Sequence, residues 1–264
     1  MMPKAKISAT LGPSGSKEAV LRYPYRKKTK PLLSKILITA GSTWVKIDDV
    51  RILTNIFTGK TGIYLAEKFN QLGYPVTLFL NPHCVERKIT RGIKVIPFRY
   101  YDDLEGELIK ELKKNDYDVI IHSAAISDYK LKEAFKGKIP SGRKELTLKL
   151  TPTAKIIKTI RKLAKETFLI QFKLQVGRKG LIEKAYQSLR ENKSDLVVAN
   201  IYEDLKEGYK AFIINKDKKR MLVTSKKSLF DNLHRFTLTG GTLRRIFFRS
   251  SSRSLSAGRD PTIQ

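Results

Sequence analysis

The chain has 264 residues, of which 41% are hydrophobic, and its 53 Lys and Arg against 25 Asp and Glu give a net charge of +28. This length allows one sizeable hydrophobic core with attachments, while the single cysteine, Cys84, excludes an internal disulfide framework. No apolar run approaches the roughly 20 residues that cross a membrane, and the N-terminus lacks an apolar signal-peptide core. We therefore expect a cytoplasmic protein with no membrane partner.

The positive charge is compatible with nucleic acid, an anionic membrane or a phosphorylated small molecule as partner. The excess of Lys and Arg is spread along the chain and is not confined to either end. Nucleic-acid-binding modules usually carry a basic stripe with interleaved aromatic residues, and the sequence shows no such stripe. A lysine-rich composition is the favoured interpretation, and a basic nucleic-acid-binding protein is kept as a minor alternative.

Regular hydrophobic patterning begins at Lys35. Short apolar runs rich in β-branched residues predict buried strands, and alternation with period 2 predicts one half-exposed strand. Apolar residues at helical spacing predict the helices, the first of which ends at Gly73. In chain order the predicted strands are 35–39, 75–80, 94–98, 118–124, 144–151 (the half-exposed one), 168–174, 195–200, 211–215 and 220–224. The predicted helices are 63–73, 103–115, 153–165, 181–192 and 226–234.

The alternation of strands and helices predicts an α/β, Rossmann-like three-layer fold with a mainly parallel central sheet. The last two strands are expected to form a terminal hairpin around residues 216–219. In sheets of this kind, ligands bind beyond the carboxyl ends of the strands. This rule directs attention to the residues that follow the predicted strands 35–39, 118–124 and 168–174.

The stretch from Thr54 to Gly62, TNIFTGKTG, contains a Gly-Lys-Thr tripeptide that closes many phosphate-binding loops. A Walker-type loop requires a further glycine five residues before Gly59, where this chain has Thr54. The dinucleotide fingerprint G-x-G-x-x-G also fails, because Phe57 stands in place of its first glycine. This failure counts against an NAD(P)-linked Rossmann-type oxidoreductase, which is the main alternative function. A purely structural role, a tight loop with close helix–sheet packing, stays open.

Five motifs in this order closely resemble those of the phosphopantothenate–cysteine ligase family. The first combines ITAGST with a downstream Thr-Asn and Gly-Lys-x-Gly, and the second is SAAISDY. The others are GKIPS with the following ELTLKLTPTAKII, then FKLQ, then NKSDLVVAN. The resemblance spans about residues 35–234, and each motif alone is weak whereas the ordered set is specific. It adds a small β-flap to the expected fold.

The resemblance implies an enzyme that joins 4′-phosphopantothenate to L-cysteine in coenzyme A biosynthesis. CTP, or ATP in other members, activates the pantothenate carboxylate as an acyl-nucleotide and releases pyrophosphate, and the cysteine amine then displaces the nucleotide. Mg²⁺ is the implied cofactor, and a homodimer is the implied assembly. The sequence leaves the preference between CTP and ATP open.

Three residues are catalytic candidates by this resemblance. Asn55 matches the asparagine that contacts the acyl-nucleotide, since a neutral amide can bond the carboxyl oxygens without competing as a nucleophile; its structural alternative is a turn-forming asparagine. Arg51 would neutralise the substrate phosphate, or else form an ordinary ion pair. Lys138, the first lysine of the flap, would assist the activation step, or else be a solvated surface lysine.

The resemblance also implies binding residues at strand and helix ends, where backbone N–H groups can meet phosphates. The four residues from 151 to 154 are expected to open a helix. The implied nucleotide-binding residues are Gly41, Ser42, Thr43, Ala124, Ala125, Asp128, Lys138, Thr151, Pro152, Thr153, Ala154, Phe172 and Lys193. The implied substrate-binding residues are Arg51, Asn55, Gly59 and Lys60. Close packing, a helix cap, core burial and solvated helix ends are the structural alternatives, and no metal ligand is assigned.

This chain departs from the family in several places. Phe57-Thr58 replaces a Ser-Ser pair and adds bulk beside the expected pocket, Pro140 replaces a flap lysine, and Ser188 stands where another lysine is common. The usual fusion partner, a flavin-dependent decarboxylase, is replaced by a basic arm, residues 1–34. We therefore expect a stand-alone ligase domain over residues 35–234 without flavin, followed by a disordered Ser/Arg-rich tail, residues 235–264.

Overall fold

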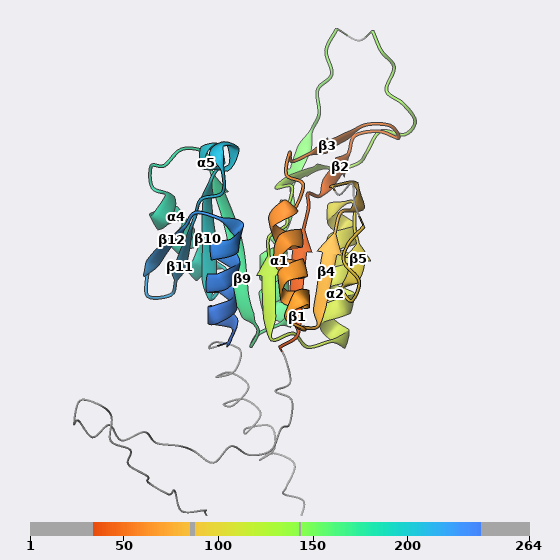
Figure 1. Ribbon diagram of the computed structural model, residues 1–264. Coiled ribbons are helices and arrows are strands. Elements are labelled where there is room, and N and C mark those ends of the chain that lie inside the picture. The colour runs from red at the N-terminus through yellow and green to blue at the C-terminus, as the bar shows by residue number, and fades with distance from the viewer. Residues whose placement is uncertain (1–33, 85–87, 143, 239–264) are drawn as a thin grey trace, which may run out of the picture. The chain divides into compact units, whose positions relative to one another are not determined.

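Figure 1 shows the computed structural model of the chain, which describes residues 34–84, 88–142 and 144–238. The predicted N-terminal arm lies outside the described residues except for residue 34, and the predicted tail lies outside them from residue 239 onward. Within the described ranges, no helix combines the length and the hydropathy that a membrane crossing requires.

An eight-stranded sheet forms the centre of the fold, in the order β12-β11-β10-β9-β6-β1-β4-β5. Neighbouring strands from β10 to β5 run parallel, and β11 and β12 add an antiparallel hairpin at the other edge. The mainly parallel sheet and the terminal hairpin are thus confirmed. The strand bounds are β1 Ile36–Ala40, β4 Val76–Leu80, β5 Lys94–Pro97, β6 Val119–His122, β9 Phe168–Gln175, β10 Leu196–Ile201, β11 Ala211–Asn215 and β12 Arg220–Val223.

Strand β1 lies in the middle of the sheet and is buried on both faces. Its register pairs Ile36 with Val76 of β4 on one side and with Val119 of β6 on the other. Ile36 and Ile38 belong to one hydrophobic cluster, whereas Leu37 belongs to a second cluster on the opposite face. Because both faces are covered, such strands are continuous apolar runs without the alternation of a half-exposed strand.

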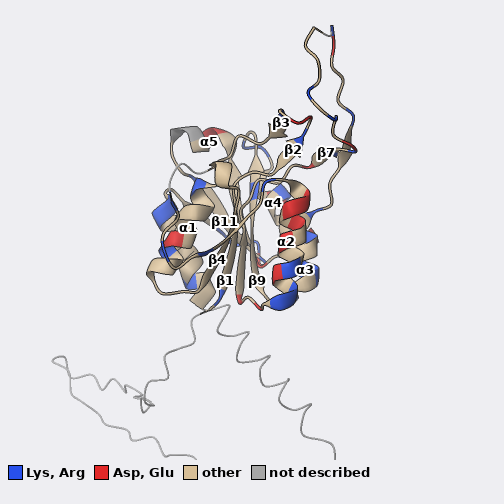
Figure 2. Cartoon of the chain, turned by 90° about the vertical axis from the view of Figure 1, so that its right-hand side faces the viewer, with Lys and Arg blue, Asp and Glu red and all other residues tan. Residues whose placement is uncertain are grey.

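Helices cover both faces of the sheet and complete three layers. On one face, α1 packs against the last described helix, residues 226–238, where the ring centroids of Phe69 and Phe230 are 5.0 Å apart. Figure 2 shows α2, α3 and α4 together on the opposite face. The helix bounds are α1 Lys60–Gln71, α2 Tyr101–Lys114, α3 Ile156–Leu163, α4 Leu181–Glu191 and α5 Tyr202–Glu207, with a short 3-10 helix, η1, at Pro82–Cys84.

The last described helix continues four residues into the predicted tail. Phe236 packs against the core cluster beneath α1, and Thr237 is buried, with its hydroxyl donating to the carbonyl of His234 at 2.7 Å. Because Phe236 packs against the core and Thr237 is buried, the helix extends past residue 234 although the predicted tail is rich in Ser and Arg. The expected boundary between domain and tail at residue 235 is therefore wrong by at least this one helical turn.

Two small antiparallel hairpins stand beside the main sheet. Strand β2 (Trp44–Lys46) pairs with β3 (Ile52–Thr54), and β7 (Tyr129–Leu131) pairs with β8 (Leu150–Pro152). The predicted strand 144–151 is wrong over most of its length, because only residues 150 and 151 belong to β8. The preceding residues are largely exposed, so their period-2 alternation has no sheet face to cover. Figure 1 shows the long segment between β7 and β8, in green, reaching away from the sheet.

Candidate active site

A pocket of about 910 Å³ opens at the carboxyl ends of β1, β6, β9 and β10. It is bounded by the residues that follow three of these strands, by the loop before α1 and by the region around α5. This is the edge of the sheet at which parallel α/β folds bind ligands, and it includes the three strand ends that the sequence indicated. Eight of the residues implied by the sequence line the pocket: Gly41, Asn55, Gly59, Lys60, Ala124, Ala125, Asp128 and Phe172.

Two glycines let the first turn of α1 approach the strand ends closely. Gly59 has a φ of 73°, and a Cβ at this residue would lie 2.3 Å from the backbone nitrogen of Gly41. At Gly62 a Cβ would lie 2.6 Å from Ser123 Oγ. The structural alternative for this stretch, a tight loop with close helix–sheet packing, is therefore observed. It also brings the N-terminus of α1, which has no side-chain cap, to the pocket, where its N–H groups can meet an anion.

The residues after β1 tie the pocket walls together. Ser42 is buried, and its hydroxyl donates to the carbonyl of Phe57 at 2.6 Å. Thr43 donates its N–H to the carbonyl of Ala125 at 3.1 Å, and its side-chain oxygen accepts the N–H of Ser127 at 2.9 Å. Ser42 and Thr43 therefore hold the loops in register, and neither is among the described lining residues of the pocket.

Asn55 bridges two of the loops that border the pocket. Its side-chain amide donates to the carbonyl of Ala125 at 3.3 Å, which links the loop before α1 to the loop after β6. Phe57 lines the pocket and meets Tyr202 edge-on, with ring centroids 6.4 Å apart. The Phe57 ring, which stands where the family usually has a serine, therefore contacts the α5 side of the pocket.

Arg51 and Lys138 lie outside the described lining of the pocket. The Arg51 guanidinium pairs with Asp48, at 2.7 Å between Nη1 and Oδ2, and also donates to the carbonyl of Ile139 at 3.3 Å. Asp48 accepts the N–H of Ile139 at 3.0 Å. These bonds clamp the segment that carries Lys138, whose own side chain is exposed, onto the loop after β2. The ion-pair alternative for Arg51 is thus observed.

The clamp depends on an ionised Asp48. Burial of the carboxyl group opposes ionisation, but the backbone N–H groups of Ile139, Val50 and Arg51, together with the Arg51 guanidinium, bring its pKa below the ordinary value. The carboxylate therefore stays charged at neutral pH, and its bonds to both segments persist.

Residues 151–154 do not open a helix. Thr151 and Pro152 belong to β8, and α3 begins only at Ile156. Thr153 donates its hydroxyl to the carbonyl of Ser127 at 2.8 Å, and none of the four residues is among the described lining of the pocket. The expectation that these residues open a helix is wrong, because Thr151 and Pro152 are still extended and paired with β7. Their assignment to nucleotide binding stays a prediction.

Asp128 lies at the rim of the pocket, where its carboxylate pairs with Lys155 at 2.5 Å. About 64% of its side chain is exposed, so it can contact a ligand only by exchanging or sharing this partner. Phe172 lines the pocket from β9, and its partly buried ring also packs against the core. Its assignment to nucleotide binding stays a prediction.

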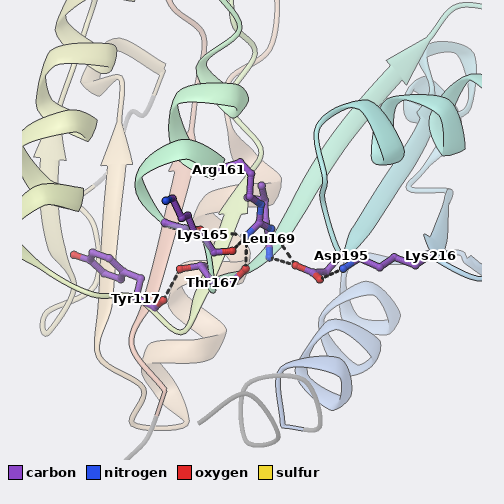
Figure 3. Close-up of polar contacts among 8 residues, drawn as sticks. Tyr117, Arg161, Lys165, Thr167, Leu169, Asp195 and Lys216 are labelled. Atoms are coloured by element: carbon purple, nitrogen blue, oxygen red, sulfur yellow. Dashed lines mark hydrogen bonds and ion pairs between the residues drawn. The ribbon is translucent and has the colours of Figure 1, made fainter. Parts of the chain in front are cut away.

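Lys193 lies at the opposite ends of the strands from the pocket, just before the amino end of β10. It has a φ of 52° and lies between the end of α4 and Leu196, the first residue of β10. The pocket lies at the other end of that strand, roughly 15–20 Å away at the rise of a β-strand. Within this chain Lys193 therefore does not belong to the pocket. Figure 3 shows the ion-pair network near the amino end of β10, in which Asp195 binds Arg161 at 3.1 Å and Lys216 at 2.6 Å.

A buried histidine lies beneath the pocket. The Nδ1 atom of His122 is 3.0 Å from Thr39 Oγ1, which also accepts the N–H of Ala124 at 3.1 Å. Burial lowers the pKa of His122 to about 4. The ring is therefore neutral at physiological pH and supports the residues after β6 as part of the core.

Further lining residues escaped the sequence interpretation. Those on β9 and β10 belong to motifs that were recognised, but no role was assigned to them. Lys226 was not assigned a role because it lies outside every recognised motif, after the antiparallel hairpin and at the start of the predicted helix 226–234. The lining residues that were not assigned include Ser123, Lys173, Leu174, Asn200, Tyr202, Leu205, Tyr209 and Lys226.

The described residues do not form a resident metal site. They include no cluster of three or more His, Cys, Asp or Glu side chains placed to hold a metal ion. Asp128 is the one carboxylate among the described pocket residues, and it is paired with Lys155. Mg²⁺ in nucleotide-binding sites is commonly held by one or two carboxylates together with substrate phosphates, and the described lining offers one such carboxylate.

Comparison with known proteins gives consistent results. Residues 33–237 match the family described as the DNA/pantothenate metabolism flavoprotein C-terminal domain. The chain is 35% identical over 200 residues to the coenzyme A biosynthesis bifunctional protein CoaBC of Thermococcus kodakarensis, which covers 75% of this chain and 47% of that protein. The chain thus spans about half the length of the curated relatives it matches.

Solved structures share the fold. The DNA/pantothenate metabolism flavoprotein from Streptococcus pneumoniae aligns with a TM-score of 0.71 and 27% identity, covering 78% of this chain and 99% of that one. A Cab2 variant in complex with phosphopantothenate-cysteine aligns with a TM-score of 0.67 at 18% identity, covering 81% of this chain and 88% of that one. The Rossmann-like fold and the family resemblance are confirmed, and the chain belongs to the DNA/pantothenate metabolism flavoprotein C-terminal domain family.

Proposed function

We propose that this chain joins 4′-phosphopantothenate to L-cysteine in coenzyme A biosynthesis, through an acyl-nucleotide formed from CTP or ATP. The observation that carries the proposal is that motif residues far apart in the sequence converge in one pocket. Asn55, the turn from Gly59 to Gly62, the loop after β6 and Phe172 all line it. Membership of the family and the similarity to CoaBC of Thermococcus kodakarensis support the same activity.

The reaction consists of two transfers. A carboxylate oxygen of phosphopantothenate bonds to the α-phosphorus of the nucleotide, and pyrophosphate leaves. The cysteine nitrogen then bonds to the acyl carbon, the nucleoside monophosphate leaves, and the amine loses a proton. Both transfers bring anions together and pass through an intermediate that water can hydrolyse, so the site has to supply positive charge and restrict water.

The pocket supplies these elements from its own residues. Lys60 and the uncapped N-terminus of α1 place positive charge beside Gly41. Asn55 offers an amide that is already oriented by Ala125, and in this proposal it bonds the acyl group. Asp128 is the described lining carboxylate that could help to hold Mg²⁺ together with the nucleotide phosphates, and the ion would neutralise part of their charge.

Arg51 and Lys138 are proposed to act at the same reaction from the clamped segment. In this proposal Arg51 neutralises the substrate phosphate, and Lys138 assists formation of the acyl-nucleotide. Two neighbouring carboxylates support the idea of a defined position for this segment. Asp49 accepts the N–H of Gly137 and Asp48 accepts the N–H of Ile139, so the backbone is fixed on both sides of Lys138.

We also propose that the chain forms a homodimer through the β2–β3 hairpin. Large apolar side chains are exposed on β3 and beside it, namely Val50, Ile52, Leu53 and Ile56. Contiguous exposed apolar residues commonly mark protein interfaces, and a two-fold dimer covers one patch with its own copy. Light scattering should give a dimer mass that Leu53→Glu lowers, whereas Leu222→Glu, a similarly exposed site on β12, should leave it unchanged. A dimer that survives Leu53→Glu would exclude this surface.

The test of the activity is release of pyrophosphate from CTP or ATP by the full chain with phosphopantothenate and cysteine. Release that requires phosphopantothenate, together with formation of the amide product, supports the ligase. A parallel assay without cysteine separates activation from amide formation. Absence of release with both nucleotides contradicts the proposal.

A further inference from the structure

Besides Lys60 and Lys173, the described lining of the pocket includes a third lysine, Lys226, whose element belongs to none of the recognised motifs. Lys60 is the first residue of α1, and Lys226 is the first residue of the last described helix. Both line the same pocket. The two lysines are far apart in the sequence, so only the fold brings them together.

Packing between the two helices fixes this arrangement. Phe69 of α1 and Phe230 of the last described helix contact each other edge to face, with centroids 5.0 Å apart. Ser225 caps the helix that begins at Lys226, because its hydroxyl oxygen accepts the N–H of Ser228 at 3.0 Å. Figure 1 shows α1 and this helix, in orange and blue, on the same side of the sheet. Lys226 therefore starts from a rigid position at the pocket.

The charge of these two lysines is not balanced by the surrounding carboxylates. Among the described residues, neither Lys60 nor Lys226 forms an ion pair, whereas the neighbouring Lys227 pairs with Asp231 at 2.8 Å. Asp128, the carboxylate in the described lining, is paired with Lys155. Burial lowers the pKa of Lys226, and the ammonium group of Lys60 lowers it further. A partly buried Lys226 and an exposed Lys60 that repel each other are a suitable receptor for a multiply charged anion.

We propose that Lys226 and Lys60 together bind the phosphates of the nucleotide, so that Lys226 is a further binding residue of the site. The N–H groups at the uncapped end of α1 contribute to the same anion subsite. The identity of the ligand rests on the proposed ligase function, but the chemistry of the subsite does not. Inorganic pyrophosphate, the leaving group in that function, is therefore the simplest probe.

The experiment measures pyrophosphate binding to the full chain by isothermal titration calorimetry at low and moderate salt. Lys226→Gln should weaken binding by roughly tenfold or more, the usual effect of losing a charge-assisted hydrogen bond. Lys227→Gln removes the same charge one residue away from a lysine that is already paired, and it should change affinity less than about twofold. Lys226→Arg should restore most of the affinity, and Lys60→Gln should weaken it.

Thermal unfolding of each variant controls for misfolding. If Lys226→Gln binds pyrophosphate as well as Lys227→Gln does, or if the unmodified chain does not bind pyrophosphate, the inference is wrong. The probe requires neither phosphopantothenate nor cysteine. A chain that loses pyrophosphate binding with Lys226→Gln but shows no ligase activity would therefore retain the anion subsite and refute only the proposed function.

Discussion

Replacing Gly62 by alanine is expected to destabilise this protein, although the same replacement at Gly106 should stabilise it. Both glycines lie in helices, Gly62 in the first turn of α1 and Gly106 within α2. Alanine is favoured over glycine in a helix by about 0.8–1 kcal/mol. Propensity alone therefore predicts a gain in stability at both positions.

The surroundings reverse the sign at Gly62. A Cβ at Gly106 would meet no heavy atom within 4 Å, whereas a Cβ at Gly62 would lie 2.6 Å from Ser123 Oγ and 2.8 Å from Ala40 Cβ. The Ser123 hydroxyl donates to the carbonyl of Thr39 at 2.6 Å, and Ala40 ends a fully buried strand, so neither neighbour can move easily. Overpacking of this kind costs about 1–3 kcal/mol.

The two effects together predict that Gly62→Ala changes the free energy of unfolding by between about zero and a loss of 2 kcal/mol. Gly106→Ala should gain up to about 1 kcal/mol. Urea denaturation of both variants and of the unmodified chain gives the comparison, provided that the m-values agree. Equal stabilisation by the two substitutions would refute the close packing of α1 against the ends of β1 and β6.

Four further results are expected. Asn55→Ala should still release pyrophosphate but accumulate or leak the acyl-nucleotide, which quenched samples analysed by chromatography would show, because the amide is lost from the pocket. Lys138→Gln should slow pyrophosphate release in a single turnover, because it removes the proposed flap cation. Lowering the pH from about 6.5 to 4 should remove up to roughly 3 kcal/mol of stability, since burial holds the pKa of native His122 at about 4 while the unfolded chain takes up a proton. Asp195→Asn should cost about 3 kcal/mol, because it removes the buried negative charge that pairs with both Arg161 and Lys216.

Each of these expectations has an outcome that contradicts it. Product formation at the normal rate by Asn55→Ala would remove its assigned role, and an unchanged single turnover would do the same for Lys138→Gln. For His122, stability that depends on pH to the same degree in His122→Gln as in the unmodified chain would exclude this ring as the source; the lowered pKa of His234 acts in the same direction and would remain. An unfolding midpoint that Asp195→Asn leaves in place would show that the ion-pair network is dispensable.

The sequence was sufficient for features that depend on short-range pattern. Continuous apolar runs such as those around Ile38 predicted the buried parallel strands, because strands covered on both faces carry no alternation. Helices with a clear apolar face were also predicted with small errors at their ends. Residues 145–149 show the limit of this reasoning, since they alternate as a strand would but meet no partner strand.

Part of the candidate site could be inferred for a related reason. In a parallel sheet, the residues after several strands meet at one edge whatever the separation of those strands in the sequence, so the sequence alone is enough to place Gly41 and Ala124 together. The same rule could not separate lining residues from supporting ones. Ser42 and Arg51 lie within a few residues of Gly41 and Asn55 in the sequence, yet neither is among the described lining residues. Ser42 instead bonds the carbonyl of Phe57, and Arg51 pairs with Asp48.

The sequence by itself determined the family, the mainly parallel sheet and the edge at which a ligand would bind, because these follow from ordered motifs and hydrophobic period. Only the tertiary structure decided which side chains share the pocket. Lys193 lies at the far end of β10, whereas Lys226, which has no motif of its own, lines the pocket with Lys60. The physical reason is that helix packing, set by contacts such as Phe69 against Phe230, brings distant positions together in a way that no local pattern records.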